Sequence, residues 1–270
     1  MSISRSDRIM NYWLGCACTG IVSLSMFLGV ESLKHVQHER HTEKKAAKYL
    51  GSSEKYAVLV SGYNEARFTY ALSCISKFLV QTGFQRNYIS ILDMSQKKQG
   101  TRMHLQKKLE ELAEVIDGDD LFVLHFSTHG ERRKVDNQVE STLVLSFGIE
   151  DITERELQQY LARIKPKYGI VSTDSCYGGG IAKRMGKGNF IGVSGTQEDT
   201  VAMATFGDTF GLYFYCAFAC PTLTDINKDG RVSVNEAFSY AKRMHIPARK
   251  GYFIPLLVSE QDVAKISLNE

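Results

Sequence analysis

Short apolar stretches and amphipathic stretches alternate along the chain from about residue 55 onward. The first two pairs predict strands at Tyr56–Val60 and Tyr88–Leu92, with helices at Thr69–Gln81 and Thr101–Ile116 after them. The pattern then predicts further strands at Leu121–Phe126, Leu143–Ser146, Tyr168–Thr173 and Asn189–Ser194, and a helix at Glu154–Arg163. Strands separated by helices predict an α/β domain with a mostly parallel central sheet and helices on both faces.

A different pattern precedes this domain. From Ile9 to Val30 there is no charged residue, and at about 1.5 Å per residue this run can cross a hydrocarbon core of about 30 Å. A retained anchor is favoured over a cleaved signal peptide, because Phe27-Leu28-Gly29-Val30 offers no small-x-small cleavage site. The predicted organisation is a basic segment at 1–8, a membrane anchor or signal peptide at 9–30, a polar tether at 31–54 and the α/β domain at 55–270.

This organisation predicts a single-pass membrane protein with an N-terminal anchor. Basic residues flank the uncharged run on both sides, so the sequence leaves open which side of the membrane holds the domain.

Composition narrows the classes of partner. The 270 residues are 43% hydrophobic, which allows one sizeable core, and the net charge of +3 comes from 33 basic and 30 acidic residues. No basic stripe interleaved with aromatic residues stands out, so nucleic acid is not expected as a partner. The four cysteines after the uncharged run have no regular spacing, which argues against a disulfide framework or a zinc site.

Two predicted strands end in chemically reactive residues. One closes with His129 and Gly130, and the other closes with Cys176, which is followed by a tyrosine and three glycines. The carboxyl ends of neighbouring parallel strands meet at one edge of a sheet, where active sites collect. A thiol needs an imidazole to take its proton, and the backbone N–H groups of Gly130 and Cys176 can stabilise an oxyanion. The sequence therefore predicts Cys176 as nucleophile and His129 as its acid/base partner.

His125 is the competing histidine. A cysteine or a histidine taken alone is more often a buried structural residue. His129 and Cys176, however, both stand at strand ends that glycine follows. Because His125 lies within its strand, we expect packing to orient it, and His129 is preferred for catalysis.

These segments resemble those of the clan of caspases, metacaspases, legumains and the catalytic subunit of the glycosylphosphatidylinositol transamidase. The resemblance covers about residues 55–245. His129-Gly130 carries it, Asp174-Ser175-Cys176 is similar to the metacaspase nucleophile motif, and the segment with Asn64 and Arg67 is similar to legumains, although its spacing is one residue longer. The resemblance implies a caspase-like α/β domain with a Cys/His dyad and leaves the branch open.

The substrate pocket is predicted around Asp174, which shares a strand face with Cys176 because side chains alternate along a strand. An acidic pocket selects Arg or Lys, as the metacaspase resemblance implies. If Arg67 reaches the same pocket, as the legumain resemblance implies, the paired charges favour Asn, and we expect Asn ahead of Arg or Lys. Ser194, at the end of the last predicted strand, is the third candidate substrate-binding residue.

Past the nucleophile, a twelve-residue segment fits the EF-hand calcium loop at every constrained position. Its candidate metal ligands are Asp225, Asn227, Asp229, Arg231, Ser233 and Glu236. The alternative is a capping turn, because Ser233-x-x-Glu236 is a capping box that opens a helix predicted at Val234–Met244. Calcium is thus a candidate cofactor, and no organic cofactor is implied.

The combined prediction is a membrane-anchored cysteine endopeptidase of the legumain or caspase type, which acts on a protein or peptide after Asn or a basic residue. One alternative is a transpeptidase or transamidase, in which an amine resolves the acyl-enzyme. Another is a calcium-responsive scaffold that keeps the fold without catalysis.

Overall fold

The computed structural model describes residues 53–63, 65–93, 102–145, 150–202, 206–246, 250–251 and 253–269. The predicted basic segment, the predicted membrane span and nearly all of the predicted tether lie outside these residues. Within the described ranges, no helix has the length and apolar character needed to cross a membrane.

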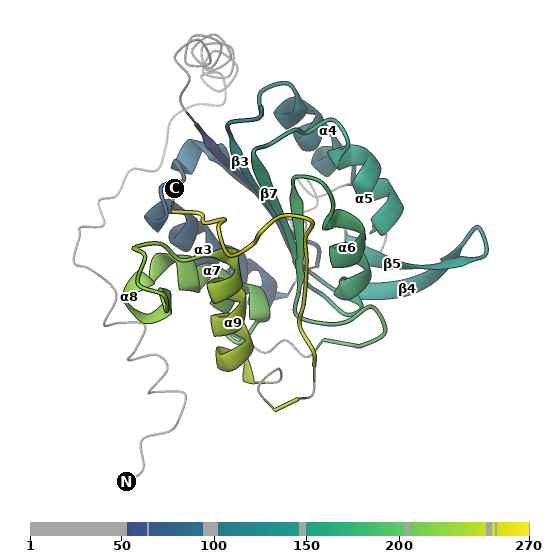
Figure 1. Cartoon of the computed structure of the whole chain (residues 1–270). Helices are drawn as coiled ribbons and strands as arrows, with labels where there is room; N and C mark the ends of the chain where they lie inside the picture. Colours follow the sequence, from purple (N-terminus) through teal and green to yellow (C-terminus); the bar gives the residue numbers. More distant parts are fainter. Residues whose placement is uncertain are drawn as a thin grey trace. The chain divides into compact units, whose positions relative to one another are not determined.

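The main sheet has six strands in the order β2-β1-β3-β7-β8-β9, and all neighbours are parallel except β8 and β9 (Figure 1). Its strands are β1 (Lys55–Ser61), β2 (Ile89–Asp93), β3 (Leu121–Ser127), β7 (Tyr168–Asp174), β8 (Phe190–Ser194) and β9 (Leu256–Val258). The three central strands are buried at nearly every position, because helices cover both of their faces. The prediction of a mostly parallel, doubly covered sheet is confirmed.

Helices lie on opposite faces of the sheet (Figure 1). On one face are α4 (Arg102–Ala113), α5 (Glu154–Leu161) and α6 (Gly178–Met185), and on the other are α3 (Ala66–Gln81), α7 (Phe210–Ala219) and α9 (Val234–Met244). Alternation along the strands divides the side chains between these layers: Phe122 and Leu124 join the core under α4 and α5, whereas His125 meets Tyr215 of α7. Two short helices, η1 (Arg86–Tyr88) and α8 (Pro221–Thr224), complete the described helices.

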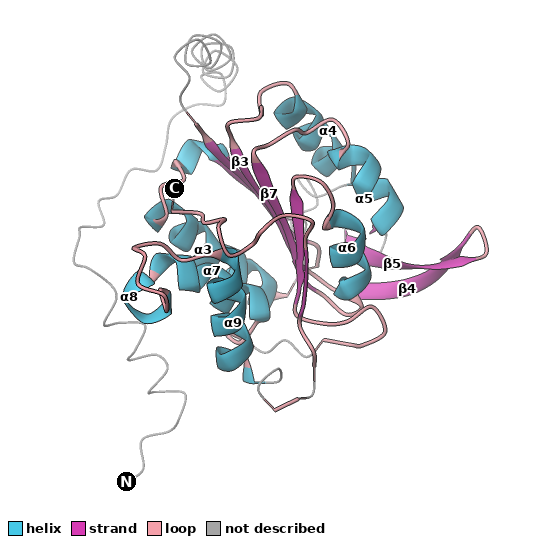
Figure 2. Cartoon of the chain, viewed as in Figure 1, coloured by secondary structure: helices cyan, strands magenta, loops and turns pink. Residues whose placement is uncertain are grey.

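A second, antiparallel sheet of three strands was only partly anticipated. It consists of β4 (Gly130–Val135), β5 (Gln138–Leu145) and β6 (Glu150–Thr153), and its first two strands form the long hairpin in magenta in Figure 2. Asp136 and Asn137 connect them with positive φ at both positions, the geometry that matches hairpin twist. The sequence predicted only a strand at Leu143–Ser146 here, and β4 starts directly at the glycine after His129.

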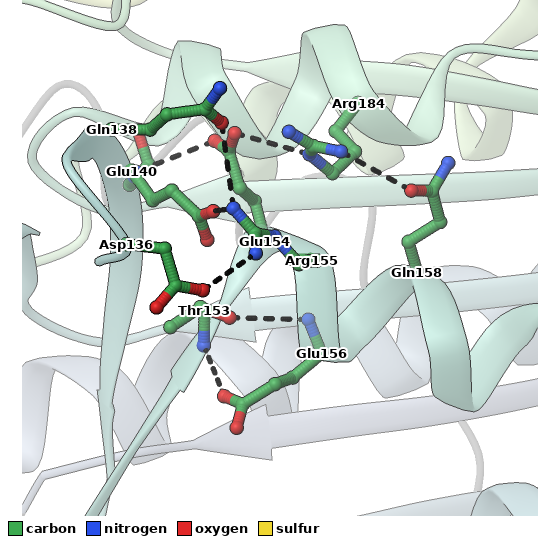
Figure 3. Close-up of polar contacts among 10 residues, drawn as sticks. Asp136, Gln138, Glu140, Thr153, Glu154, Arg155, Glu156, Gln158 and Arg184 are labelled. Atoms are coloured by element: carbon green, nitrogen blue, oxygen red, sulfur yellow. Dashed lines mark hydrogen bonds and ion pairs between the residues drawn. The ribbon is translucent and has the colours of Figure 1, made fainter.

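The hairpin is fastened to the helices by the polar contacts in Figure 3. Arg155 of α5 donates to Asp136 at 3.1 Å and forms an ion pair with the buried Glu140. Glu154 accepts a hydrogen bond from Arg184 of α6 at 3.1 Å. Thr153 and Glu156 form the predicted capping box, with both of its reciprocal bonds present. These contacts hold the hairpin, α5 and α6 as one unit beside the carboxyl ends of β3 and β7.

Candidate active site

The predicted nucleophile, Cys176, and its predicted partner, His129, follow two adjacent strands. β3 and β7 pair in parallel with Ser127 opposite Asp174, and His129 and Cys176 each lie two residues beyond that pair. The two segments touch: a Cβ added to Gly130 would overlap the backbone carbonyl oxygen of Cys176. Glycine at position 130 is therefore required for the backbone after His129 to pass the backbone of Cys176.

Cys176 lies in a tight turn between β7 and α6. The next residue, Tyr177, has φ of 57°, a left-handed conformation that reverses the chain just before the helix. The half-buried thiol accepts a hydrogen bond from the N–H of Ala202 at 3.2 Å, and the N–H of Tyr177 donates to the carbonyl of Thr200 at 2.7 Å. The segment after β8 thus passes directly beside the nucleophile.

His129 is paired with a carboxylate that the sequence did not single out. Its Nε2 lies 2.6 Å from Oε1 of Glu65, and its ring is edge-on to Tyr63 at 5.0 Å and Phe68 at 5.3 Å between centroids. Burial alone would raise the pKa of Glu65, but hydrogen bonds from His129 and Arg67 lower it below its usual value. Glu65 remains ionised at neutral pH and is placed to orient the imidazole.

Arg67 lies with Glu65. Its Nε is 2.6 Å from Oε2 of Glu65, and its guanidinium is 4.7 Å from the centroid of the Phe68 ring. Because α3 begins at Ala66, three residues earlier than predicted, Arg67 lies in the first helical turn beside the carboxylate that precedes it. Arg67 is not among the residues that line the pocket around Asp174, so the structure does not support the predicted Arg67 and Asp174 pocket.

A pocket opens beside the nucleophile and is lined by residues from β7 to the C-terminal region. We call it the Asp174 pocket; its lining residues are Asp174, Ser175, Gly195, Thr196, Ala202, Thr209, Phe210, His245 and Phe253. Ala202 contacts both this pocket and the Cys176 thiol, which places the two next to each other.

Asp174 itself is almost wholly buried, with 4% of its side chain exposed. Its Oδ1 accepts a hydrogen bond from the N–H of Gly211 at 2.8 Å. Burial raises the pKa of Asp174 to about 6 and the charge of Asp208 adds to this rise, while hydrogen bonds from Gly211 and Thr209 oppose it. The pocket therefore contains a carboxylate that titrates close to neutral pH.

The competing histidine, His125, and the third candidate substrate-binding residue, Ser194, both have structural surroundings. His125 is fully buried, and burial lowers its pKa to about 3, so it is neutral. Ser194 is also buried; its Oγ accepts from the N–H of Thr196 at 3.1 Å and is outside the pocket lining. The prediction that Ser194 binds substrate is not supported, because its hydroxyl closes the turn after β8.

Comparison of the sequence with protein-family models finds one family that matches it. The model for the caspase domain matches residues 71–249, more than half of the chain. The chain belongs to the caspase-domain family. None of the curated proteins compared matches the sequence.

Two solved structures resemble this caspase domain. A Geobacter sulfurreducens protein aligns with a TM-score of 0.56 at 14% identity, over 79% of this chain and 97% of the other. Caspase-1 from Spodoptera frugiperda aligns with a TM-score of 0.47 at 12% identity, over 77% of this chain and 86% of the other. At such identities the first similarity shows a shared fold, which agrees with the caspase-like α/β architecture described above.

The EF-hand-like loop of this caspase domain has the contacts of a capping turn. Both oxygens of Glu236 are engaged: Oε2 accepts from Ser233, and Oε1 accepts from the N–H groups of Ile226 and Asn227. Asp225 accepts from the N–H of Gly230, and Ser233 and Glu236 complete a capping box for α9.

No group of three acidic, histidine or cysteine side chains in the described ranges is arranged to hold a metal. These contacts do not support the calcium site predicted at residues Asp225, Asn227, Asp229, Arg231, Ser233 and Glu236. They support the capping alternative, in which the acidic residues satisfy backbone N–H groups.

Proposed function

We propose that this caspase domain is a cysteine endopeptidase that cleaves after a basic residue. The observation that carries the proposal is the parallel pairing of β3 with β7, which puts His129 and Cys176 equally far beyond adjacent strand ends, with Gly130 packed on Cys176. This juxtaposition is what a thiol nucleophile and its proton acceptor require.

The proposed reaction has two steps. In the first, His129 takes the proton of the Cys176 thiol, Sγ bonds to the substrate carbonyl carbon, and the peptide C–N bond breaks as His129 returns the proton to the leaving amine. In the second, His129 deprotonates a water molecule whose oxygen bonds to the thioester carbon, the C–S bond breaks to release the acid product, and the imidazolium returns the proton to the Cys176 sulfur. Backbone N–H groups of Gly130 and Cys176 are the proposed donors to the oxyanion, and Glu65 stabilises the charged imidazolium that forms transiently within each step.

The Asp174 pocket supports a basic residue before the scissile bond. Asp174 is buried and lies beside a second acid, Asp208, while Arg67 pairs with Glu65 outside the pocket lining. A buried carboxylate without a cationic partner favours a ligand that brings a positive charge. This observation moves our expectation from Asn toward Arg or Lys.

The dyad is tested by comparing three variants with the wild-type domain. Cys176→Ala and His129→Ala should each lower peptide turnover by about 1000-fold or more, and Cys176→Ala should abolish labelling by a peptidyl acyloxymethyl ketone. Cys74→Ala, which removes a partly exposed thiol on α3, is the matched control and should keep both activities. Full turnover in Cys176→Ala would disprove the proposal, and product formed only with an added amine would indicate transpeptidation.

We also propose that the chain is anchored by its N-terminus, on the support of the uncharged run Ile9–Val30. Full-length protein should remain with membranes during carbonate extraction, and protein that lacks residues 1–50 should not. Recovery of the full-length chain in the carbonate supernatant would contradict the anchor.

A further inference from the structure

Two buried polar atoms face each other beneath the Asp174 pocket without a hydrogen-bond partner. They are Nε2 of His125 and Oδ2 of Asp174, 3.7 Å apart, on side chains that are 0% and 4% exposed. This separation is longer than a hydrogen bond, yet each atom left unpaired in the interior costs free energy. Because buried polar atoms are nearly always hydrogen-bonded, an unpaired buried pair of this kind needs a functional explanation.

The opposite side of the His125 ring is held by a chain of hydroxyl groups. Nδ1 of His125 lies 2.9 Å from Oγ of Ser172, and the same Oγ lies 2.6 Å from the hydroxyl of Tyr215. The register of β3 with β7 places His125 opposite Ser172, and Tyr215 reaches them from α7. All three side chains are buried, so water does not compete for these bonds.

The direction of donation along this chain follows from counting protons. The hydroxyl of Tyr215 has one proton, and Oγ of Ser172 is its acceptor among the described residues. If Tyr215 donates to Ser172 and the Ser172 hydroxyl donates in turn to Nδ1 of His125, the single proton of the neutral imidazole is on Nε2. The reverse direction would leave the Tyr215 proton buried without an acceptor. Neutral His125 therefore directs an N–H at Oδ2 of Asp174.

The backbone of α7 holds this pair in place. A Cβ added to Gly211 would lie 2.6 Å from Cε1 of His125 and 2.7 Å from Oδ2 of Asp174, so only glycine fits between the helix and the pair. The N–H of Gly211 already donates to the other oxygen of Asp174 at 2.8 Å. One carboxylate thus receives a backbone donor on one oxygen and faces the His125 donor with the other.

We propose that His125 is a positioning residue for the substrate-binding carboxylate, and that Tyr215, Ser172 and His125 form a buried relay that directs one N–H to Asp174. The relay fixes the direction of the carboxylate and favours its ionised form, so that it is ready for the cationic side chain of the substrate. This inference rests on the proposed function, because it assigns Asp174 to the substrate pocket.

Other titratable groups surround Asp174 and belong to its electrostatics. Asp208 precedes α7 and raises the pKa of Asp174, Tyr215 faces it from α7, and His245 at the end of α9 lines the same pocket. Cys176 follows two residues later on the same segment. Asp208, Tyr215 and His245 stay unchanged in the variants that test the His125 donor most directly, and Cys176 is replaced alike in all of them.

The test measures the titration of Asp174 itself, in protein that cannot turn over substrate. In a Cys176→Ala background labelled with carbon-13 at the aspartate carboxyl groups, the Asp174 resonance is assigned by its loss in Asp174→Asn and followed from pH 4 to pH 8. Removing the N–H donor with His125→Leu should make Asp174 bind its proton about tenfold more tightly. His125→Gln, whose amide N–H has a similar reach, should restore most of the difference.

Ser172→Ala is the second variant, since it keeps the imidazole and removes only the group that fixes its tautomer. It should shift the Asp174 titration in the same direction as His125→Leu, by a smaller factor. In the background with Cys176 intact, the same variants should raise KM for an Arg substrate below pH 7 and leave kcat at saturation within about twofold.

The outcomes separate this inference from the proposed function. An unchanged Asp174 titration in both His125→Leu and Ser172→Ala overturns the relay, even if both variants are less heat-stable. A tenfold shift that His125→Gln reverses supports the relay, even if the intact domain shows no peptidase activity. Equal shifts in His125→Leu and His125→Gln overturn it, because loss of polarity and not loss of the donor would then be the cause.

Discussion

Two histidines four residues apart, one within β3 and one just after it, each face a carboxylate, yet the two pairs differ in almost every physical respect. His129 and Glu65 are 2.6 Å apart with 39% and 32% of their side chains exposed. His125 and Asp174 are 3.7 Å apart and almost completely buried. Hydrogen bonds from His129 and Arg67 outweigh burial and lower the pKa of Glu65, whereas burial raises that of Asp174 to about 6 and lowers that of His125 to about 3.

The roles proposed for the two pairs follow their environments and not their residue types. A general acid and base must gain and lose a proton near neutral pH, and buried His125 does not gain one above about pH 3. Asp174, by contrast, loses its proton near pH 6 inside a pocket, which suits the recognition of a cation. The exposure of His129 agrees with its proposed part in proton transfer, and the burial of Asp174 agrees with its proposed part in binding.

Of the two carboxylates, the buried one should give the larger effect when it is neutralised. Asp174→Asn should lower kcat/KM for a substrate with Arg before the scissile bond by about 100-fold, because one partner of a desolvated charge pair is removed. The measurement is kcat/KM for matched peptides that differ only in Arg, Asn or Leu at that position. Equal loss on all three peptides would show that Asp174 supports the fold and does not select the side chain.

Neutralising the exposed carboxylate should have a smaller effect of a different kind. Glu65→Gln keeps a hydrogen-bond acceptor for His129 but removes the charge that stabilises the imidazolium, so kcat should fall by about tenfold on every substrate while KM changes little. The control is Glu131→Gln, which neutralises an exposed carboxylate two residues after His129. A Glu65→Gln variant that changes only the preference between peptides would place Glu65 in the pocket and contradict the comparison.

The sequence predicted His129 of the exposed pair but not its partner, Glu65. His129 and Cys176 were found because each ends an apolar strand beside glycine, and strand order then brings them together. Glu65 was missed because a single acidic residue after β1 has no pattern around it, although its place at the carboxyl end of a central strand was a usable signal.

For the buried pair, local sequence patterns predicted Asp174 but not the residues that surround it. Asp174 was identified by alternation along its strand, but its surroundings come from Thr209, Phe210 and His245, which no local pattern connects to β7. Arg67 was misplaced because its helix begins earlier than predicted, and α6 was not predicted because three glycines open it. The calcium prediction rested on a pattern of polar residues that serves equally well to cap a helix.

The smallest expected effect concerns stability in acid, where the two members of the buried pair act in opposite directions. The folded state raises the pKa of Asp174 from 3.8 to about 6, so this group adds stability below about pH 4 and loses that contribution as the pH rises through 6. The folded state lowers the pKa of His125 from 6.5 to about 3, so its contribution is present above pH 6.5 and is lost as the pH falls toward 3.

Between about pH 4 and pH 6 the contributions of Asp174 and His125 to the free energy of unfolding therefore change with pH in opposite directions. Replacing one of the two residues should leave the pH dependence caused by the other. Asp174→Asn leaves His125, so its free energy of unfolding should rise more steeply with pH than that of the wild type, by about 1 kcal/mol per pH unit in this interval. His125→Leu leaves Asp174 and should change the slope in the opposite sense. Urea unfolding of the Cys176→Ala domain at pH 4.5, 5.5 and 6.5 measures these slopes, and Glu131→Gln is again the control. Parallel pH dependence in all four proteins would mean that neither buried group titrates differently in the folded and unfolded chains, and the contrast between the buried and exposed pairs would then lose its electrostatic basis.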